Sequence, residues 1–271
     1  MGRIAFPQLS HIIGRALAFP ATVLTYDQAR FDDYIENYVK PQVTELLTHY
    51  GPIGLIWFDT PYNISDQQSH ELMELVHQLQ PNCLVSGRVG NTKGDYASAG
   101  DNRIPEDLIE GDWETPATIN DTWGYKSFDH NWKSVEDMLR KLVDIVSKNG
   151  NYLLNVGPTA EGVVPQESID RLLAMGEWLQ VNGESIYGCN AGPVQGAPGL
   201  RTTQKDNAIY LHVFDLPKDG AVKLALTQKP KEAFLLASGE PLGFKHRCGR
   251  LTVQLPESGL DAIDTVIKLT V

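Results

Sequence analysis

Along most of this chain a segment with helical periodicity is followed directly by a short apolar run, and this repeated unit leaves few folds open. From Asp32 to Tyr50 the apolar residues recur at the spacing of one helical face, and Gly51 and Pro52 end the pattern. The run from Ile53 to Phe58 is continuously apolar, which is typical of a strand buried on both faces. Pro41 predicts either a kink in the helix or the start of its second half.

The same unit recurs further along. The helical segments and apolar runs that repeat it are a helix at 65–80 with a strand at 83–86, a helix at 134–148 with a strand at 152–156, and a helix at 166–181. Ser134 and Asp137 have the spacing of a capping box at the start of one of these helices. Strands that alternate with helices predict a parallel sheet covered by helices.

The pattern changes after Gly188, where short strands alternate with turns rich in Pro and Gly. The expected strands are 208–214, 221–226, 233–237, 250–255 and 265–271. They predict a small antiparallel β-sandwich. The sequence therefore predicts two domains, an α/β domain at residues 1–188 and a β-sandwich at residues 189–271.

The composition excludes some classes of function. A formal net charge of -11 and a pI of about 5.1 disfavour nucleic-acid and membrane partners, because both carry negative charge. Cys83, Cys189 and Cys248 lie far apart and have no metal-binding spacing, which is typical of free thiols, and residues 4–24 lack the features of a secretory signal. We expect a soluble cytoplasmic protein.

No sequence motif points to a metal, a cofactor or a serine nucleophile. The seven histidines lack the H-E-x-x-H spacing of a zinc site, and the chain has no G-x-S-x-G elbow. We assign no cofactor and no metal.

The first candidate for chemistry is Asp59, which directly follows the apolar run and precedes Thr60 and Pro61. Barrel and open α/β enzymes place catalytic groups at the carboxyl ends of their strands. The alternative is an Asp that only caps the turn before Pro61.

A second candidate is the long stretch from Arg88 to Tyr125, which we expect to be an irregular binding loop. It contains two tryptophans and several acidic residues: Trp113, Trp123, Asp95, Asp101, Asp112 and Glu114. Aromatic faces stack on sugar rings, and carboxyl groups supply the nucleophile and acid of glycoside hydrolysis. The alternative is that these acidic residues are only solvated loop positions.

Several segments, in one order, resemble the retaining α-L-fucosidases of glycoside hydrolase family 29. They are Tyr38 to Asp59; Gly94 to Tyr96; Trp113 and Glu114 with Thr122 to Tyr125; Val146 to Asn151 with Asn155 to Pro158; Gly176 to Trp178; and Asn182 to Gly188. The resemblance covers roughly residues 25 to 190. It implies that residues 1–188 form part of a (β/α)8-type barrel, followed by the β-sandwich.

The resemblance implies a double displacement in which Asp59 attacks the anomeric carbon of a terminal α-L-fucoside. A second carboxyl group would protonate the leaving oxygen and then activate water. Many members of the family carry a Glu shortly after the Asp-Tyr motif, whereas this chain has Asp101 there. Position favours Asp101, whereas Glu114 is favoured because its own side chain reaches further, so both remain candidates.

The resemblance also implies substrate-binding roles. Arg88 would contact the sugar oxygens, Trp123 would face the methyl group of fucose, and Trp57 and Tyr26 would line the pocket. Surface or core positions without a role in binding are the alternatives for these side chains.

Full members of the family open with about three more strand-helix units, so we expect an N-terminally shortened member with exposed sheet edges. Either residues 1–30 and a partner in a homo-oligomer cover the edge, or the enzyme is weakened. Transfer of fucosyl to acceptors other than water is a related expectation. The competing hypotheses are an inactive fucosidase-like subunit that binds sugar and a carbohydrate-binding module centred on the β-sandwich.

Overall fold

The computed structural model describes residues 27–271, which form two compact units. The first unit comprises the described residues up to Ser98 together with Gly111–Trp113, and the second comprises Ala99–Glu110 and Glu114–Val271. Among the described residues, no helix combines the length and the apolar character needed to cross a bilayer. The predicted domain boundary near residue 188 lies inside the second unit and stays a prediction.

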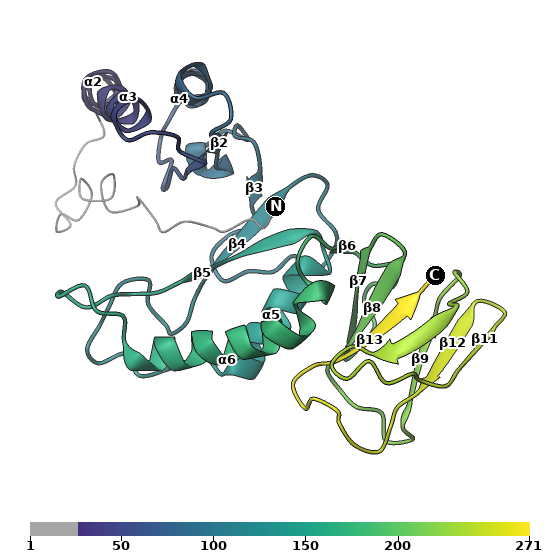
Figure 1. Ribbon diagram of the computed structural model, residues 1–271. Helices are drawn as coiled ribbons and strands as arrows, with labels where there is room; N and C mark the ends of the chain where they lie inside the picture. The colour runs from purple at the N-terminus through teal and green to yellow at the C-terminus, as the bar shows by residue number, and fades with distance from the viewer. Residues whose placement is uncertain (1–26) are drawn as a thin grey trace. The chain divides into compact units, whose positions relative to one another are not determined.

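The first unit opens with one nearly continuous helical segment (Figure 1). It consists of α2 (Gln28–Tyr34), a π-helical turn η2 (Ile35–Val39) and α3 (Lys40–His49). The N–H of Lys40 bonds to the carbonyl of Ile35, five residues back, so the widened turn directly precedes Pro41. Pro41 therefore begins the second half of the helix, in the first turn, where a missing N–H leaves no hydrogen bond unmade.

The first unit also contains the predicted parallel strands, in shorter form. β1 (Leu55–Ile56) pairs in parallel with β2 (Leu84–Val85), and α4 (Asp66–Leu79) connects them. The expectation of a strand buried on both faces is wrong for β1. Ile56 and Val85 are buried against α3 and α4, whereas Leu55 and Leu84 are 38% and 47% exposed.

Two short elements complete this unit: a 3-10 turn, η3 (Gly87–Val89), and β3 (Ala97–Ser98). Asp95 lies between these two elements in the sequence. Its Oδ2 accepts the N–H of Val85 in β2 at 2.7 Å and lies 3.0 Å from Nε2 of His77 in α4. Asp95 thus closes the loop onto β2 and α4.

The second unit contains most of a strand that the sequence did not predict, β4 (Trp113–Thr118), whose first residue, Trp113, belongs to the first unit. β4 lies within the stretch expected to be irregular, and all six of its residues are buried. β4 neighbours β5 (Gly150–Asn155) in one sheet, and α5 (Val135–Val146) connects the two strands. After β5 come α6 (Gln166–Asn182) and the 3-10 turn η4 (Gly183–Ser185). α5 and α6 are the helices predicted at 134–148 and 166–181. β4 was missed because Glu114 and Pro116 interrupt its apolar character.

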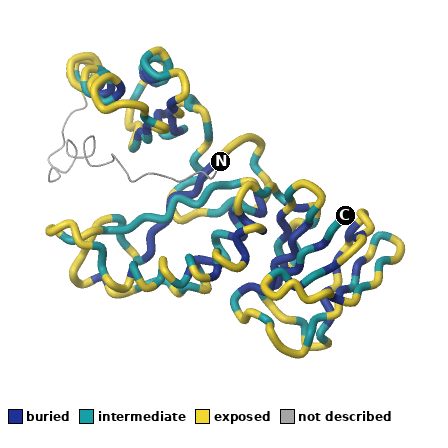
Figure 2. The backbone as a smooth tube through the Cα atoms, viewed as in Figure 1, coloured by how far each residue is buried: buried dark blue, intermediate teal, exposed yellow. Residues whose placement is uncertain are grey.

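The β-sandwich is confirmed, and it has more strands than predicted. One sheet has the order β10-β13-β8-β7-β6 and the other β11-β12-β9, with antiparallel neighbours throughout. The strands are β6 (Asn190–Ala191), β7 (Leu200–Lys205), β8 (Ala208–Val213), β9 (Ala221–Ala225), β10 (Glu232–Leu235), β11 (Phe244–Arg247), β12 (Arg250–Gln254) and β13 (Thr265–Thr270). Figure 2 shows buried positions along these strands, and they form one apolar core.

β7 and β11 escaped prediction because neither has apolar alternation. In β7, Thr202 and Thr203 are fully buried, and their hydroxyl groups donate hydrogen bonds to the carbonyls of Val194 and Ser185. A polar side chain that is hydrogen-bonded in this way can occupy a core position.

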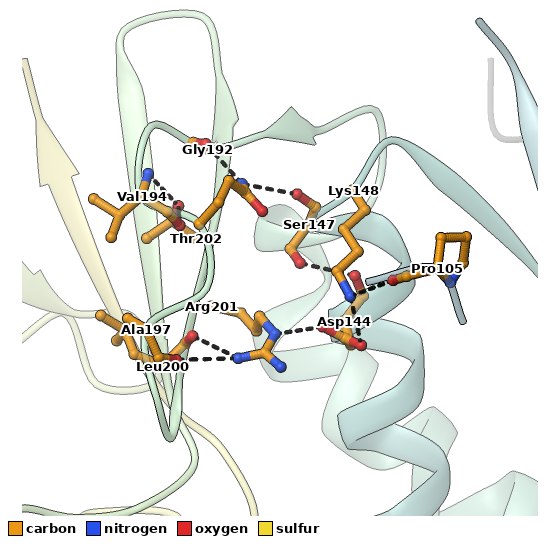
Figure 3. Close-up of polar contacts among 11 residues, drawn as sticks. Pro105, Asp144, Ser147, Lys148, Gly192, Val194, Ala197, Leu200, Arg201 and Thr202 are labelled. Atoms are coloured by element: carbon orange, nitrogen blue, oxygen red, sulfur yellow. Dashed lines mark hydrogen bonds and ion pairs between the residues drawn. The ribbon is translucent and has the colours of Figure 1, made fainter. Parts of the chain in front are cut away.

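A polar junction joins α5 to the β-sandwich within the second unit (Figure 3). Arg201 of β7 pairs with Asp144 of α5, whose other oxygen lies 3.1 Å from Lys148 Nζ. Lys148 Nζ also donates to the carbonyl of Pro105 at 2.8 Å. The junction therefore connects the sandwich, the helix and the segment Ala99–Glu110.

Candidate active site

Asp59 lies three residues beyond β1, on the carboxyl side of the parallel strand pair. Its side chain is 38% exposed. Oδ1 accepts the backbone N–H of Thr60 at 2.8 Å and a hydrogen bond from Arg88 Nη1 at 3.1 Å. No hydrogen bond from the described residues reaches Oδ2. One oxygen of this carboxylate is therefore held in place and the other remains available.

Arg88 is itself held from three sides within the first unit. Its guanidinium lies 4.7 Å from the centre of the Trp57 ring, and Nε donates to Ser98 Oγ at 3.0 Å. Together with the Asp59 contact, these interactions fix a side chain that is only 18% exposed. The structure thus brings three predicted site residues, Asp59, Arg88 and Trp57, into one cluster.

Ser98 is part of this cluster and was not singled out in the sequence. A lone Ser in a loop gives no periodic or motif signal. The available clue was its place just after the Gly94 to Tyr96 motif, but only the fold shows that its hydroxyl meets Arg88.

The two acid candidates, Glu114 and Asp101, have different surroundings in the second unit. Glu114 is the second residue of β4 and is only 7% exposed. Asp101 is exposed and lies in the turn from Gly100 to Arg103, which is closed by a bond from the Arg103 N–H to the Gly100 carbonyl at 3.4 Å.

The segment that carries Asp101 runs along β4 in the same direction. The N–H of Ala99 bonds to the carbonyl of Glu114 at 2.9 Å, and that of Asn102 bonds to the carbonyl of Pro116 at 2.8 Å. The Asn102 side chain then accepts the N–H of Thr118, the last residue of β4, at 3.0 Å. Asp101 therefore lies beside the second half of β4, next to Pro116, which is two residues (about 7 Å) beyond Glu114 along the strand.

Trp123 lies in the loop after β4, next to the end of β5 and the loop that follows β5. Its carbonyl accepts a hydrogen bond from Asn155 Nδ2 at 2.6 Å. A Cβ added at Gly157 would lie 2.8 Å from the N of Tyr125 and 3.1 Å from the Trp123 carbonyl oxygen, so only Gly allows this approach. The two loops are packed together beyond the carboxyl ends of neighbouring strands.

The same region of the second unit contains a pocket of about 230 Å³. Tyr125, His130, Trp132 and Asn155 are among the residues that line it. Neither Asp101 nor Trp123 lines this pocket, so it does not define the reaction centre.

Tyr26, the remaining predicted substrate contact, lies outside the described residues. Within residues 27–271, no group of three or more His, Cys, Asp or Glu side chains is placed to hold a metal ion.

Comparison with known proteins finds α-L-fucosidases among the relatives of this chain. The family model described as Alpha-L-fucosidase matches residues 18–184. An α-L-fucosidase of Dictyostelium discoideum is 31% identical over 206 residues, and the tissue α-L-fucosidase of Rattus norvegicus is 32% identical over 214 residues. These alignments cover 71% and 73% of this chain.

A solved structure agrees with these sequences. The α-L-fucosidase isoenzyme 1 from Paenibacillus thiaminolyticus superposes with a TM-score of 0.82 and 38% identity, over 89% of this chain and 62% of that one. The chain spans less than half the length of the curated relatives above, 44% and 45%. The likeness to this solved structure confirms the expected fold class, part of a (β/α)8-type barrel followed by a β-sandwich.

Proposed function

Because this chain belongs to the α-L-fucosidase family, we propose that it acts as a retaining α-L-fucosidase, releasing terminal α-L-fucose from fucosylated glycans or small fucosides. The observation that carries the proposal is the state of Asp59. Its Oδ1 is held by Arg88 and Thr60, while Oδ2 has no hydrogen bond from the described residues. A carboxylate fixed through one oxygen presents the other in a defined direction, as a nucleophile requires.

The proposed reaction has two displacements. In the first, Asp59 Oδ2 forms an ester bond to the anomeric carbon as the bond to the leaving oxygen breaks, and that oxygen takes a proton from a second carboxyl group. In the second, the same group, now a carboxylate, removes a proton from water. The resulting hydroxide oxygen bonds to the anomeric carbon and the ester bond to Asp59 breaks, so fucose leaves with its configuration retained.

We propose Asp101 rather than Glu114 as that second group. Two observations support this choice. Asp101 is exposed and lies near the carboxyl end of β4, where barrel enzymes collect their catalytic groups. Glu114 is buried near the opposite end of the strand.

On the substrate side, Arg88 and Trp57 would line the sugar site next to Asp59, and Trp123 would face the methyl group of fucose. The same covalent intermediate would react with a sugar hydroxyl in place of water, which gives transfucosylation. A neutral glycan suits a protein with a net charge of -11.

The cellular setting is also a proposal. We propose a cytoplasmic homo-oligomer, and the three cysteines, which are all free in the structure, support a reducing compartment.

The decisive test is the variant Asp59→Asn. The amide cannot act as a nucleophile, so kcat/KM on an aryl α-L-fucoside should fall by several orders of magnitude with an unchanged circular dichroism spectrum. A 2-deoxy-2-fluoro-fucosyl fluoride should label the wild-type protein at Asp59, as identified by peptide mass spectrometry.

The matched control is Asp107→Asn, which makes the same change at an exposed residue. It should leave kcat/KM within twofold of wild type. If the wild-type protein binds fucose but neither turns over the substrate nor becomes labelled, the protein is a sugar-binding subunit and the hydrolase proposal is wrong.

A further inference from the structure

The turn that carries Asp101 depends on the residue after it. Asn102 has a φ of 53°, in the left-handed region, and it occupies the third position of the turn from Gly100 to Arg103. A turn of four residues with a positive φ at its third position requires Gly or Asn there. Asn102 therefore permits the backbone geometry that places Asp101 at the second position.

The side chain of Asn102 adds what Gly cannot supply. Its Oδ1 accepts the backbone N–H of Thr118 at 3.0 Å and a hydrogen bond from Lys133 Nζ at 2.9 Å. Thr118 Oγ1 lies 3.3 Å from the same oxygen, so three donor groups surround it. The turn is thus attached to the last residue of β4 and to the residue that precedes the N-cap of α5.

Lys133 is fully engaged in this attachment. Its ammonium also donates to the carbonyl of Thr118 at 2.5 Å and to Thr118 Oγ1 at 2.9 Å, so its three hydrogens have three acceptors. The Thr118 hydroxyl in turn donates to the carbonyl of Asn120. The three side chains of Asn102, Thr118 and Lys133 form one connected network.

We infer that Asn102 is a positioning residue, which holds the carboxyl group of Asp101 at the carboxyl end of β4 for proton transfer. This inference rests on the proposed function and on Asp101 as the acid. Asp101 lies between the backbone bond of Ala99 and the bonds of Asn102, so any shift of Asn102 moves the turn that bears the carboxyl group.

The inference predicts a specific kinetic signature. An acid is needed most when the leaving group is a poor one, and least when it departs as a stable phenolate. Loss of position should therefore lower kcat/KM for a phenyl α-L-fucoside and spare kcat/KM for a 2,4-dinitrophenyl α-L-fucoside. A purely structural defect would lower both equally.

The variant that tests this is Asn102→Gly, which keeps the left-handed backbone and removes the side chain. We expect kcat/KM for the phenyl substrate to fall by about 10-fold to 100-fold, since a misplacement of about 1 Å costs up to about 100-fold. For the dinitrophenyl substrate, kcat and KM should fall together, because slower water activation makes the fucosyl-enzyme accumulate, and azide should restore kcat.

Two further variants serve as controls. Asn102→Asp keeps an acceptor oxygen for Thr118 and Lys133 and should recover most of the lost activity on the phenyl substrate. The second control is Asn149→Gly, at a position remote from Asp101 in the sequence. Asn149 also has a positive φ, 64°, and its side chain also accepts a backbone N–H, that of Ala191. This variant should show the same ratio of the two kcat/KM values as wild type.

Equal losses on both substrates in Asn102→Gly, or no loss on either, would overturn the positioning role while leaving the hydrolase proposal intact. A wild-type protein that neither turns over these substrates nor is labelled at Asp59 would overturn both. The two failures are therefore distinguishable.

Discussion

At the scale of single residues, the two carboxyl groups of the proposed reaction are held in different ways. Asp59 is restrained directly, because Arg88 and the backbone of Thr60 bond to one of its oxygens. Asp101 is restrained through its neighbours in the turn. A nucleophile needs a fixed direction of attack, whereas an acid and base must serve two steps with different partners, and the two modes of restraint fit these needs.

The assignment of the acid gives a prediction at this scale. Asp101→Ala should lower kcat on an activated aryl fucoside, and added azide should restore it, because azide attacks the fucosyl-enzyme without needing a base. Glu114→Ala removes a buried side chain and should gain nothing from azide. Steady-state rates with and without azide decide between them, and rescue of Glu114→Ala alone would reverse the assignment.

At the scale of elements, helix caps determine where the strand–helix units begin. Ser65 and Gln68 form a complete capping box at the start of α4, in which Ser65 Oγ accepts the N–H of Gln68 at 3.2 Å and the Gln68 side chain accepts that of Ser65 at 3.0 Å. At the start of α5, Ser134 accepts the N–H of Asp137 at 3.1 Å, which is one of the two bonds of the capping box that the sequence predicted. These bonds satisfy N–H groups that have no partner within the helix.

The capping box gives a prediction about stability. Ser65→Ala should reduce the free energy of unfolding by about 1 kcal/mol, because it leaves the Gln68 N–H without its acceptor. Urea unfolding followed by circular dichroism measures the change. The control Ser258→Ala, at an exposed position, should shift the free energy by less than about 0.5 kcal/mol. Equal effects in the two variants would contradict the role of the cap.

At the scale of the whole molecule, the second unit joins strand–helix elements to the β-sandwich through polar contacts at several points. One is the junction of Asp144 and Arg201. Another is Glu184 in η4, whose Oε1 accepts hydrogen bonds from Lys268 of β13 at 2.5 Å and from Tyr210 of β8 at 2.7 Å. The hydrogen bond from Lys268 is the largest, and the one from Tyr210 the next largest, of the causes that lower the pKa of Glu184 below its ordinary value of 4.5.

The Glu184 contact predicts how stability depends on pH. Since its pKa is lowered by folding, its contribution is complete above the unfolded value of 4.5 and is lost as the pH falls through the lower folded value. The side chain is 46% exposed, so we expect a loss of only about 0.5 kcal/mol. The urea midpoints of wild type and Glu184→Gln should differ at pH 7, and this difference should shrink at pH 3. An equal difference between the two proteins at both pH values would contradict this role.

Much of the fold could be predicted because its signals are local. The helices near residues 65, 134 and 166 and the strands at 208, 221, 250 and 265 agree with the sequence periodicity to within one or two residues. β4 could not be predicted in this way, since its segment contains Glu114 and Pro116 and its stability comes from neighbours that lie elsewhere in the chain. The same holds for β7, where buried Thr hydroxyl groups depend on acceptors in other segments.

The sequence by itself determined the kind of unit from which this protein is built and the place of Asp59 just beyond a parallel strand. Both depend on periodicity and on the order of residues along a short segment. Only the tertiary structure decided that Arg88 and Ser98 meet beside Asp59, and that Asp101 lies at the carboxyl end of β4 while Glu114 is buried lower in the strand. Those relations arise from hydrogen bonds and packing between segments that periodicity treats separately, so no local pattern could have specified them.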